Sequence, residues 1–186
     1  MWVLYEFLLF ISLLLFLPKA LWRRRLPHRG WTMRLGRYPE AVHKRLGRQQ
    51  AIWVHAVSVG EVIAVHPLIR RLTAEYPTVP LVLSTVTPSG FAVASKLLGE
   101  DGVTIYAPLY FRLTVQRALQ TIQPRMLVLA ESELWPNTLA EIGARGIPAY
   151  LVNARLSDRA LRGWQRWPGK MAMPCAPPNA SRPRRV

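Results

Sequence analysis

AIWVHAV, at residues 51–57, is a short run of apolar, largely β-branched and aromatic side chains that only His55 interrupts. Four more short apolar runs follow it, at residues 79–85, 103–106, 126–130 and 147–152. Near-continuous apolar runs of about four to eight residues are typical of parallel strands that are buried on both faces. The sequence therefore predicts five buried strands.

Helical patterns lie between these runs. Apolar side chains recur three or four residues apart over Val62–Leu72, which indicates an amphipathic helix after the first strand. Three further helices are expected: one that Ser89 caps and that runs through Leu98, one over Thr114–Ile122, and one from Pro136 to Gly146. The alternation of strands and helices predicts an α/β fold, a Rossmann-like doubly wound parallel sheet.

The charge of the chain is large but unevenly placed. The 186 residues carry 25 Lys and Arg against 10 Asp and Glu, a net charge of +15. Residues 1–48 hold ten basic and two acidic side chains, residues 49–154 hold seven of each, and residues 155–186 hold eight basic and one acidic. A nucleic-acid-binding domain carries its basic face on the fold itself, so the neutral middle argues against nucleic acid as a partner. The single Cys excludes a disulfide framework.

The first 25 residues predict a membrane anchor. Residues 7–17, FLLFISLLLFL, are apolar except for Ser12, and Arg23, Arg24 and Arg25 follow. Arginines directly beyond an apolar segment place that side in the cytoplasm and attract anionic headgroups. We expect a basic juxtamembrane segment over residues 26–50. The anchor either spans the bilayer or lies in its interface.

The loops after the strands are the candidate site, because ligands bind at the carboxyl ends of the strands in doubly wound sheets. Ser58-Val59-Gly60-Glu61 joins the first strand to the first helix. The Glu61 carboxylate is placed either to stabilise that helix or to act as a general base. Gly60 permits a tight turn or the close approach of a ligand, and Ser58 lies beside it.

Three further loops hold candidate substrate contacts. The segment 85–90 is rich in hydroxyl groups and opens a helix, so it is either an anion-binding turn or an ordinary capped turn. The segment 153–159 fits the rim of a site or a solvated loop. Candidates in the two loops are Thr87, Ser89, Gly90, Asn153 and Arg155.

The third loop, ESELWPN at residues 131–137, is the most unusual segment. In an extended chain Glu131 and Glu133 share one face, where two like charges are costly unless they are compensated. This favours a functional role, with helix capping by one Glu as the alternative. Asn137 is a further candidate contact. The four histidines lack metal-ligand spacing, so no metal site is predicted, and His55 is expected to be a hydrogen-bonded core residue.

Four segments together resemble one family. They are WVHAVSVGE at 53–61, STVTPSG at 84–90, ESELWPN at 131–137 and VNARLSDR at 152–159. In this order and spacing they resemble the N-terminal half of 3-deoxy-D-manno-octulosonic acid (Kdo) transferases of lipopolysaccharide biosynthesis. The resemblance covers residues 1–167.

The resemblance implies a fold and an activity. The family has a two-domain GT-B glycosyltransferase fold, and residues 51–167 correspond to its acceptor-side domain. The implied reaction moves Kdo from CMP-Kdo to a lipid A precursor at the cytoplasmic face of the inner membrane, with inversion and without cofactor or metal. The implied roles are general base for Glu61 and transition-state stabiliser for Glu131. The implied partners are the donor, the acceptor and inner-membrane lipid.

The end of the chain departs from the family. Residues 168–186 are rich in Pro and Arg and match nothing in it, so we expect a disordered or frame-shifted tail. The C-terminal domain that holds most donor contacts is expected to be absent, and the chain alone is expected to have little or no transferase activity. The alternative function is a non-catalytic, membrane-anchored module that binds an anionic lipid.

Overall fold

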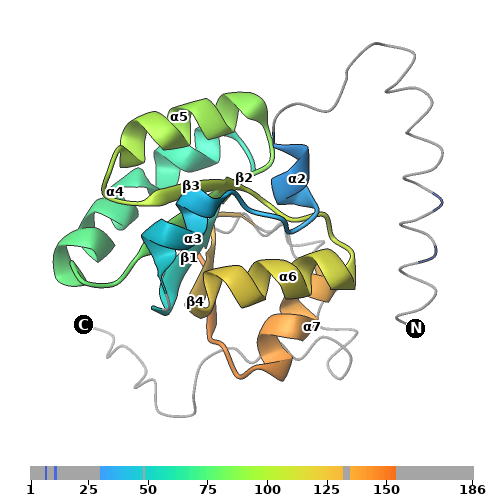
Figure 1. Cartoon of the computed structure of the whole chain (residues 1–186). Coiled ribbons are helices and arrows are strands. Elements are labelled where there is room, and N and C mark those ends of the chain that lie inside the picture. Colours follow the sequence, from blue (N-terminus) through green and yellow to red (C-terminus); the bar gives the residue numbers. More distant parts are fainter. Residues whose placement is uncertain (1–6, 8–10, 12–29, 48, 132–134, 154–186) are drawn as a thin grey trace, which may run out of the picture.

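A computed structural model describes residues 7, 11, 30–47, 49–131 and 135–153 of the chain. Its centre is a parallel sheet with the strand order β3-β2-β1-β4-β5 (Figure 1). The strands are β1 Ala51–His55, β2 Leu81–Thr85, β3 Val103–Tyr106, β4 Pro124–Leu129 and β5 Ala149–Leu151. The five predicted strands are confirmed. β3 has the predicted bounds, and each of the other four strands begins or ends two residues away from its own predicted bound.

The strand order reverses between β1 and β4. The chain moves outward from β1 to β3, then returns to place β4 on the other side of β1. In this pair His55 lies opposite Leu129, so both strands end at the same level. This is the topological switch point of a doubly wound sheet, where such folds bind their ligands.

Helices cover both faces of the sheet (Figure 1). Four of them follow the strands: α4 Val59–Glu75, α5 Pro88–Leu98, α6 Arg112–Ile122 and α7 Pro136–Ala144. The apolar stripes of α4 and α5 pack on one face of β1, against Ile52 and Val54. Helices α6 and α7 pack on the opposite face, against Trp53. Successive side chains of a strand point to opposite faces, so the apolar run of β1 serves two cores at once.

Two short helices precede the sheet, and the sequence patterns did not predict them. Helix α2 covers Trp31–Arg34 and α3 covers Glu40–Leu46. Both lie in the stretch that was expected to be a basic juxtamembrane segment. Tyr38, Val42 and Leu46 are at most 8% exposed and join the core on the side of α6. Residues 30–47 therefore form part of the globular fold.

The start of α5 differs from the sequence prediction. Thr87, rather than Ser89, caps the helix, because the Thr87 side chain accepts a hydrogen bond from the backbone N–H of Gly90 at 3.0 Å. Ser89 lies within the first turn and is exposed. An added Cβ at Gly90 would lie 2.8 Å from Thr87 Oγ1, so this close cap requires glycine.

Both predicted terminal segments lie almost entirely outside the described residues. Of the anchor, only Phe7 and Ile11 are described, and the tail over residues 168–186 is not described. The helices within the described part of the chain are all too short or too polar to cross a bilayer.

Candidate functional site

The carboxyl ends of β1 and β4 bring the two candidate catalytic loops to one edge of the sheet. The backbone N–H of Ala130 donates to the His55 carbonyl at 2.9 Å, which ties the end of β4 to the end of β1. Glu131 is the next residue after Ala130, and Glu61 lies in the first turn of α4, which follows β1. The two carboxylates therefore project from neighbouring chain segments at the switch point.

Glu61 is held in place by its own loop. It is 9% exposed, and its Oε2 accepts a hydrogen bond from the backbone N–H of Val57 at 2.8 Å. Its Oε1 accepts from the Ser58 hydroxyl at 2.9 Å, while Ser58 Oγ caps α4 through the Glu61 N–H at 3.5 Å. These reciprocal contacts resemble a capping box. They satisfy one lone pair on each carboxylate oxygen, and each oxygen keeps another that can accept a proton.

The neighbouring glycine leaves this turn open. Gly60 is exposed in the first turn of α4, and an added Cβ there would meet only Ser58 Oγ, at 4.0 Å. The backbone at Gly60 is thus accessible beside the Glu61 carboxylate. Space for a ligand, rather than a strained turn, is what glycine provides at this position.

The second carboxylate loop is described in part. Glu131 is partly buried, whereas Glu133 and Arg155 lie outside the described residues. Asn137 is 3% exposed, and its side-chain N–H donates to the Tyr110 carbonyl at 2.7 Å, which ties α7 to the loop after β3. Asn153 is exposed, with a left-handed φ of 53° at the end of β5. Asn137 therefore has a structural contact, and Asn153 is exposed shortly after the end of β5.

The hydroxyl-rich loop lies against the end of β1. Thr87 Oγ1 caps α5 and also donates to the Val57 carbonyl at 3.5 Å. Ser89 Oγ donates to Thr87 Oγ1 at 3.4 Å. Arg34 of α2 reaches this loop and donates to the Val86 carbonyl. The loop is thus fixed to the segment that carries Glu61, and Ser89 is its exposed hydroxyl.

His55 belongs to a buried polar network, as the sequence predicted. The side chain is 7% exposed, and its Nδ1 lies 2.8 Å from Ser84 Oγ. Trp53 Nε1 donates to the same oxygen at 2.8 Å. Burial lowers the pKa of His55 to about 4, although the Glu61 carboxylate and the hydrogen bond with Ser84 act in the opposite direction. The imidazole is therefore neutral at physiological pH.

The neutral state of His55 makes the stability of the fold pH-dependent. The unfolded side chain binds a proton near pH 6.5, whereas the folded one does so only near pH 4. The contribution of the neutral His55 to the free energy of unfolding is therefore fully present above pH 6.5. It falls between pH 6.5 and 4, by up to about 1.4 kcal/mol per pH unit. We expect His55→Gln to flatten this dependence in urea unfolding measured across that window. His43→Gln, which changes an exposed histidine, should keep the wild-type slope, and an unaltered slope in His55→Gln would contradict the assignment.

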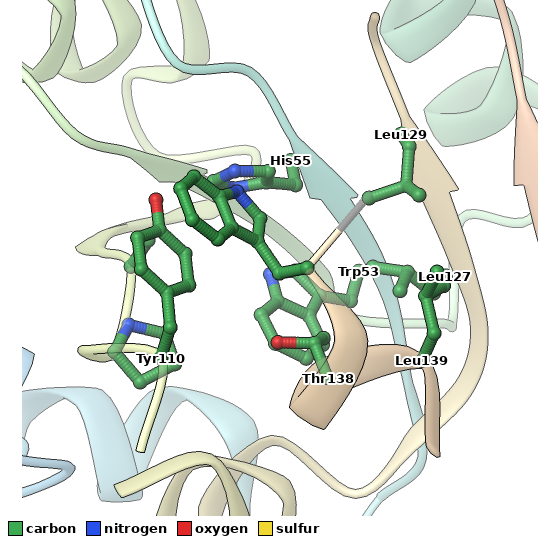
Figure 2. Close-up of a pocket in the computed structure, with 10 residues that line it drawn as sticks. Trp53, His55, Tyr110, Leu127, Leu129, Thr138 and Leu139 are labelled. Atoms are coloured by element: carbon green, nitrogen blue, oxygen red, sulfur yellow. The ribbon is translucent and has the colours of Figure 1, made fainter. Parts of the chain in front are cut away.

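A small cavity opens at the same edge, on the face that α7 covers. Residues of β1 and β4 line it together with the loop after β3 and the start of α7. Figure 2 shows Tyr110 on one side, Leu127 and Leu129 on the other, and Trp53 and His55 between them. The Tyr110 and Trp135 rings stack with centroids 3.4 Å apart and planes 9° apart. The sequence patterns missed this cavity because its aromatic residues come from three separate segments.

Within the described part of the chain, no group of three or more His, Cys, Asp or Glu side chains is placed to hold a metal ion. These residues offer two carboxylates at one edge of the sheet, with hydroxyl groups and an exposed helix N-terminus at the same edge. Such a set suits the removal of a proton from a hydroxyl and the stabilisation of developing positive charge.

Comparison with known proteins identifies relatives. Residues 29–177 match the family model described as 3-deoxy-D-manno-octulosonic-acid transferase (kdotransferase). The 3-deoxy-D-manno-octulosonic acid transferase of Haemophilus influenzae is 39% identical over 111 residues, 60% of this chain and 26% of the relative. That of Chlamydophila psittaci is 32% identical over 161 residues, 86% of this chain and 37% of the relative. A probable mitochondrial relative from Arabidopsis thaliana is 34% identical over 134 residues, 72% of this chain and 29% of the relative.

The fold and the site define a doubly wound α/β domain whose candidate site lies at the topological switch point. The family match covers well over half of the chain, so the chain belongs to the Kdo transferase family, which is a family of glycosyltransferases. The chain spans about a quarter to two fifths of the length of these relatives.

Proposed function

We propose that the chain supplies the acceptor side of a Kdo transferase of lipopolysaccharide biosynthesis. The reaction would transfer Kdo from CMP-Kdo to a lipid A precursor at the cytoplasmic face of the inner membrane, without cofactor or metal. The observation that carries this proposal is the position of Glu61. Its carboxylate is held by two hydrogen bonds at the switch point, next to an exposed helix N-terminus. Glu131 follows the adjacent strand.

In the proposed step Glu61 acts as the general base. It takes the proton of an acceptor hydroxyl while the oxygen bonds to the anomeric carbon of Kdo and CMP leaves with the electron pair. Attack opposite to CMP inverts the anomeric centre. The hydrogen bonds from Val57 and Ser58 fix the carboxylate before the acceptor arrives, so orientation contributes to the rate.

Glu131 has the complementary role in this proposal. Glycosyl transfer passes through an oxocarbenium-like transition state, which carries positive charge at the sugar ring. A carboxylate directly after β4 would stabilise that charge from the strand adjacent to the base. The basic side chains of residues 1–48 and 155–186 would hold the chain at a membrane rich in anionic lipid.

The proposal is tested by mixing two polypeptides. The full chain is combined with labelled CMP-Kdo, a lipid A precursor and the part of the Haemophilus influenzae relative that lies beyond its match with this chain. We expect labelled lipid from the mixture and little or none from either polypeptide alone. If both polypeptides are folded and the intact relative is active, but the mixture transfers no label, the proposal is wrong.

A further inference from the structure

Two residues that line the cavity beside the Tyr110–Trp135 stack each have a buried polar atom without a partner. His55 Nε2 and Trp135 Nε1 are buried, and within the described residues neither has a hydrogen-bond partner. Both residues line the same cavity. The His55 side chain is only 7% exposed. Because buried polar groups are nearly always paired, two such atoms at one cavity point to a ligand group that pairs with them.

The surrounding hydrogen bonds define what each atom can do. Ser84 has one hydroxyl proton and two possible acceptors for it, the Val54 carbonyl at 3.4 Å and His55 Nδ1 at 2.8 Å. Its oxygen also accepts from Trp53 Nε1, and the tautomer of His55 decides which atom donates in the 2.8 Å contact between His55 Nδ1 and Ser84 Oγ. A neutral imidazole carries one proton, so His55 Nε2 is an acceptor when Nδ1 carries that proton and a donor when Nδ1 does not. Trp135 Nε1–H is a donor only.

The size and walls of the cavity limit the ligand group. The cavity measures about 20 Å³, which is room for one water-sized group. Its other lining side chains are aliphatic or aromatic apart from Thr138, and none of the lining residues is charged at neutral pH. A carboxylate or phosphate would be buried here without a cation. A hydroxyl both donates and accepts, and it can satisfy both nitrogens.

We propose that this cavity is a subsite for one hydroxyl group of an uncharged saccharide. The hydroxyl accepts from Trp135 Nε1–H and pairs with His55 Nε2, as donor or acceptor according to the tautomer of the imidazole. The choice of a saccharide as the ligand rests on the proposed function. Because no lining residue is a cation, the subsite suits the acceptor sugar rather than the anionic Kdo. Neither nitrogen is in contact with solvent in this structure, so binding shifts the Trp135 ring within its stack on Tyr110.

The test observes the Trp135 indole directly. The full chain in detergent micelles is labelled with ¹⁵N-tryptophan, and the cross-peak of the Trp135 indole is identified by its loss in Trp135→Phe. N-acetylglucosamine is then titrated as a neutral saccharide and free Kdo as an anionic one. We expect N-acetylglucosamine to shift this cross-peak and free Kdo to leave it unchanged. His55→Gln keeps this cross-peak and should weaken saccharide binding about tenfold.

Stability measurements separate a binding role from a structural one. Trp135→Phe removes a donor that has no partner in the free protein, so its melting temperature should stay within about 4 °C of the wild-type value. Tyr38→Phe is the matched control, because Tyr38 also has a buried hydroxyl without a partner in the described residues but lies in the segment before α3. It should change neither stability nor saccharide binding. Trp135→Tyr replaces Trp135→Phe if the latter fails to fold.

The outcomes distinguish this inference from the proposed function. An unchanged Trp135 cross-peak with N-acetylglucosamine, or a shift with free Kdo alone, overturns the subsite even if the mixed polypeptides transfer Kdo. A shift that persists at wild-type affinity in His55→Gln also overturns it. A Trp135 shift with N-acetylglucosamine that His55→Gln weakens supports the subsite even if the transfer assay fails.

Discussion

Glu61→Gln is expected to lower Kdo transfer by the mixed polypeptides by about 10²- to 10⁴-fold, the range for loss of a general base. Glutamine keeps the shape of the side chain and can still accept a hydrogen bond from Val57 or Ser58. It cannot take a proton from the acceptor hydroxyl. The measurement is the initial rate of label transfer to the lipid A precursor, with binding of the precursor measured in parallel and expected to persist.

Two variants distinguish the proposed catalytic role of Glu61 from its role in the N-terminal cap of α4. Ser58→Ala removes the cap of α4 and one contact to Glu61, so it should cost about 1 kcal/mol of stability and at most about tenfold in rate. Glu75→Gln changes an exposed carboxylate at the other end of α4 and should leave the rate unchanged. Equal rates for Glu61→Gln and the wild type, with folding intact, would favour the non-catalytic lipid-binding module instead.

Trp53→Ala is expected to reduce the free energy of unfolding by about 3–5 kcal/mol. Trp53 of β1 is 2% exposed and packs against the helices α6 and α7. Its Nε1 donates a hydrogen bond to Ser84 Oγ at 2.8 Å. Truncation opens a large cavity and removes a buried hydrogen bond. The loss is a large part of the 5–15 kcal/mol that is typical of a domain.

Urea unfolding of the full chain, followed by far-ultraviolet circular dichroism, measures this change. Leu113→Ala is the matched control, because Leu113 is 58% exposed on α6 and its truncation should change stability by less than about 0.5 kcal/mol. A loss below about 1 kcal/mol in Trp53→Ala would show that the Trp53 side chain is not enclosed as described.

Much of the sheet could be predicted because its strands are buried on both faces. β1 is buried at every position and apolar at every position except His55, and such a continuous run distinguishes a buried strand from the segments around it. Strand ends were less well defined, since β4 begins at Pro124, two residues before the predicted run 126–130. Proline can occupy the first position of a strand, where its missing N–H costs little.

The N-terminal helices and the cavity could not be predicted for physical reasons. Helices α2 and α3 are short and rich in basic residues, and their apolar side chains show their role only when they meet β3 and α6. The cavity depends on tertiary contacts between Trp135, Tyr110 and His55, which are distant in sequence. The position of Glu61 could be predicted because a strand, a serine that can cap a helix and a glutamate follow one another closely in the sequence.

The central claim, that this chain carries the acceptor side of a Kdo transferase, is tested most directly by its binding to lipid. The full chain is titrated with nanodiscs that contain the diphosphorylated lipid A precursor and with nanodiscs of equal charge made with phosphatidylglycerol, at low and high salt. The account predicts tighter binding to the precursor discs, with a preference that persists at high salt, where charge attraction from the basic flanks is screened. Equal binding to both kinds of disc would contradict it and leave only a nonspecific attraction to anionic membranes.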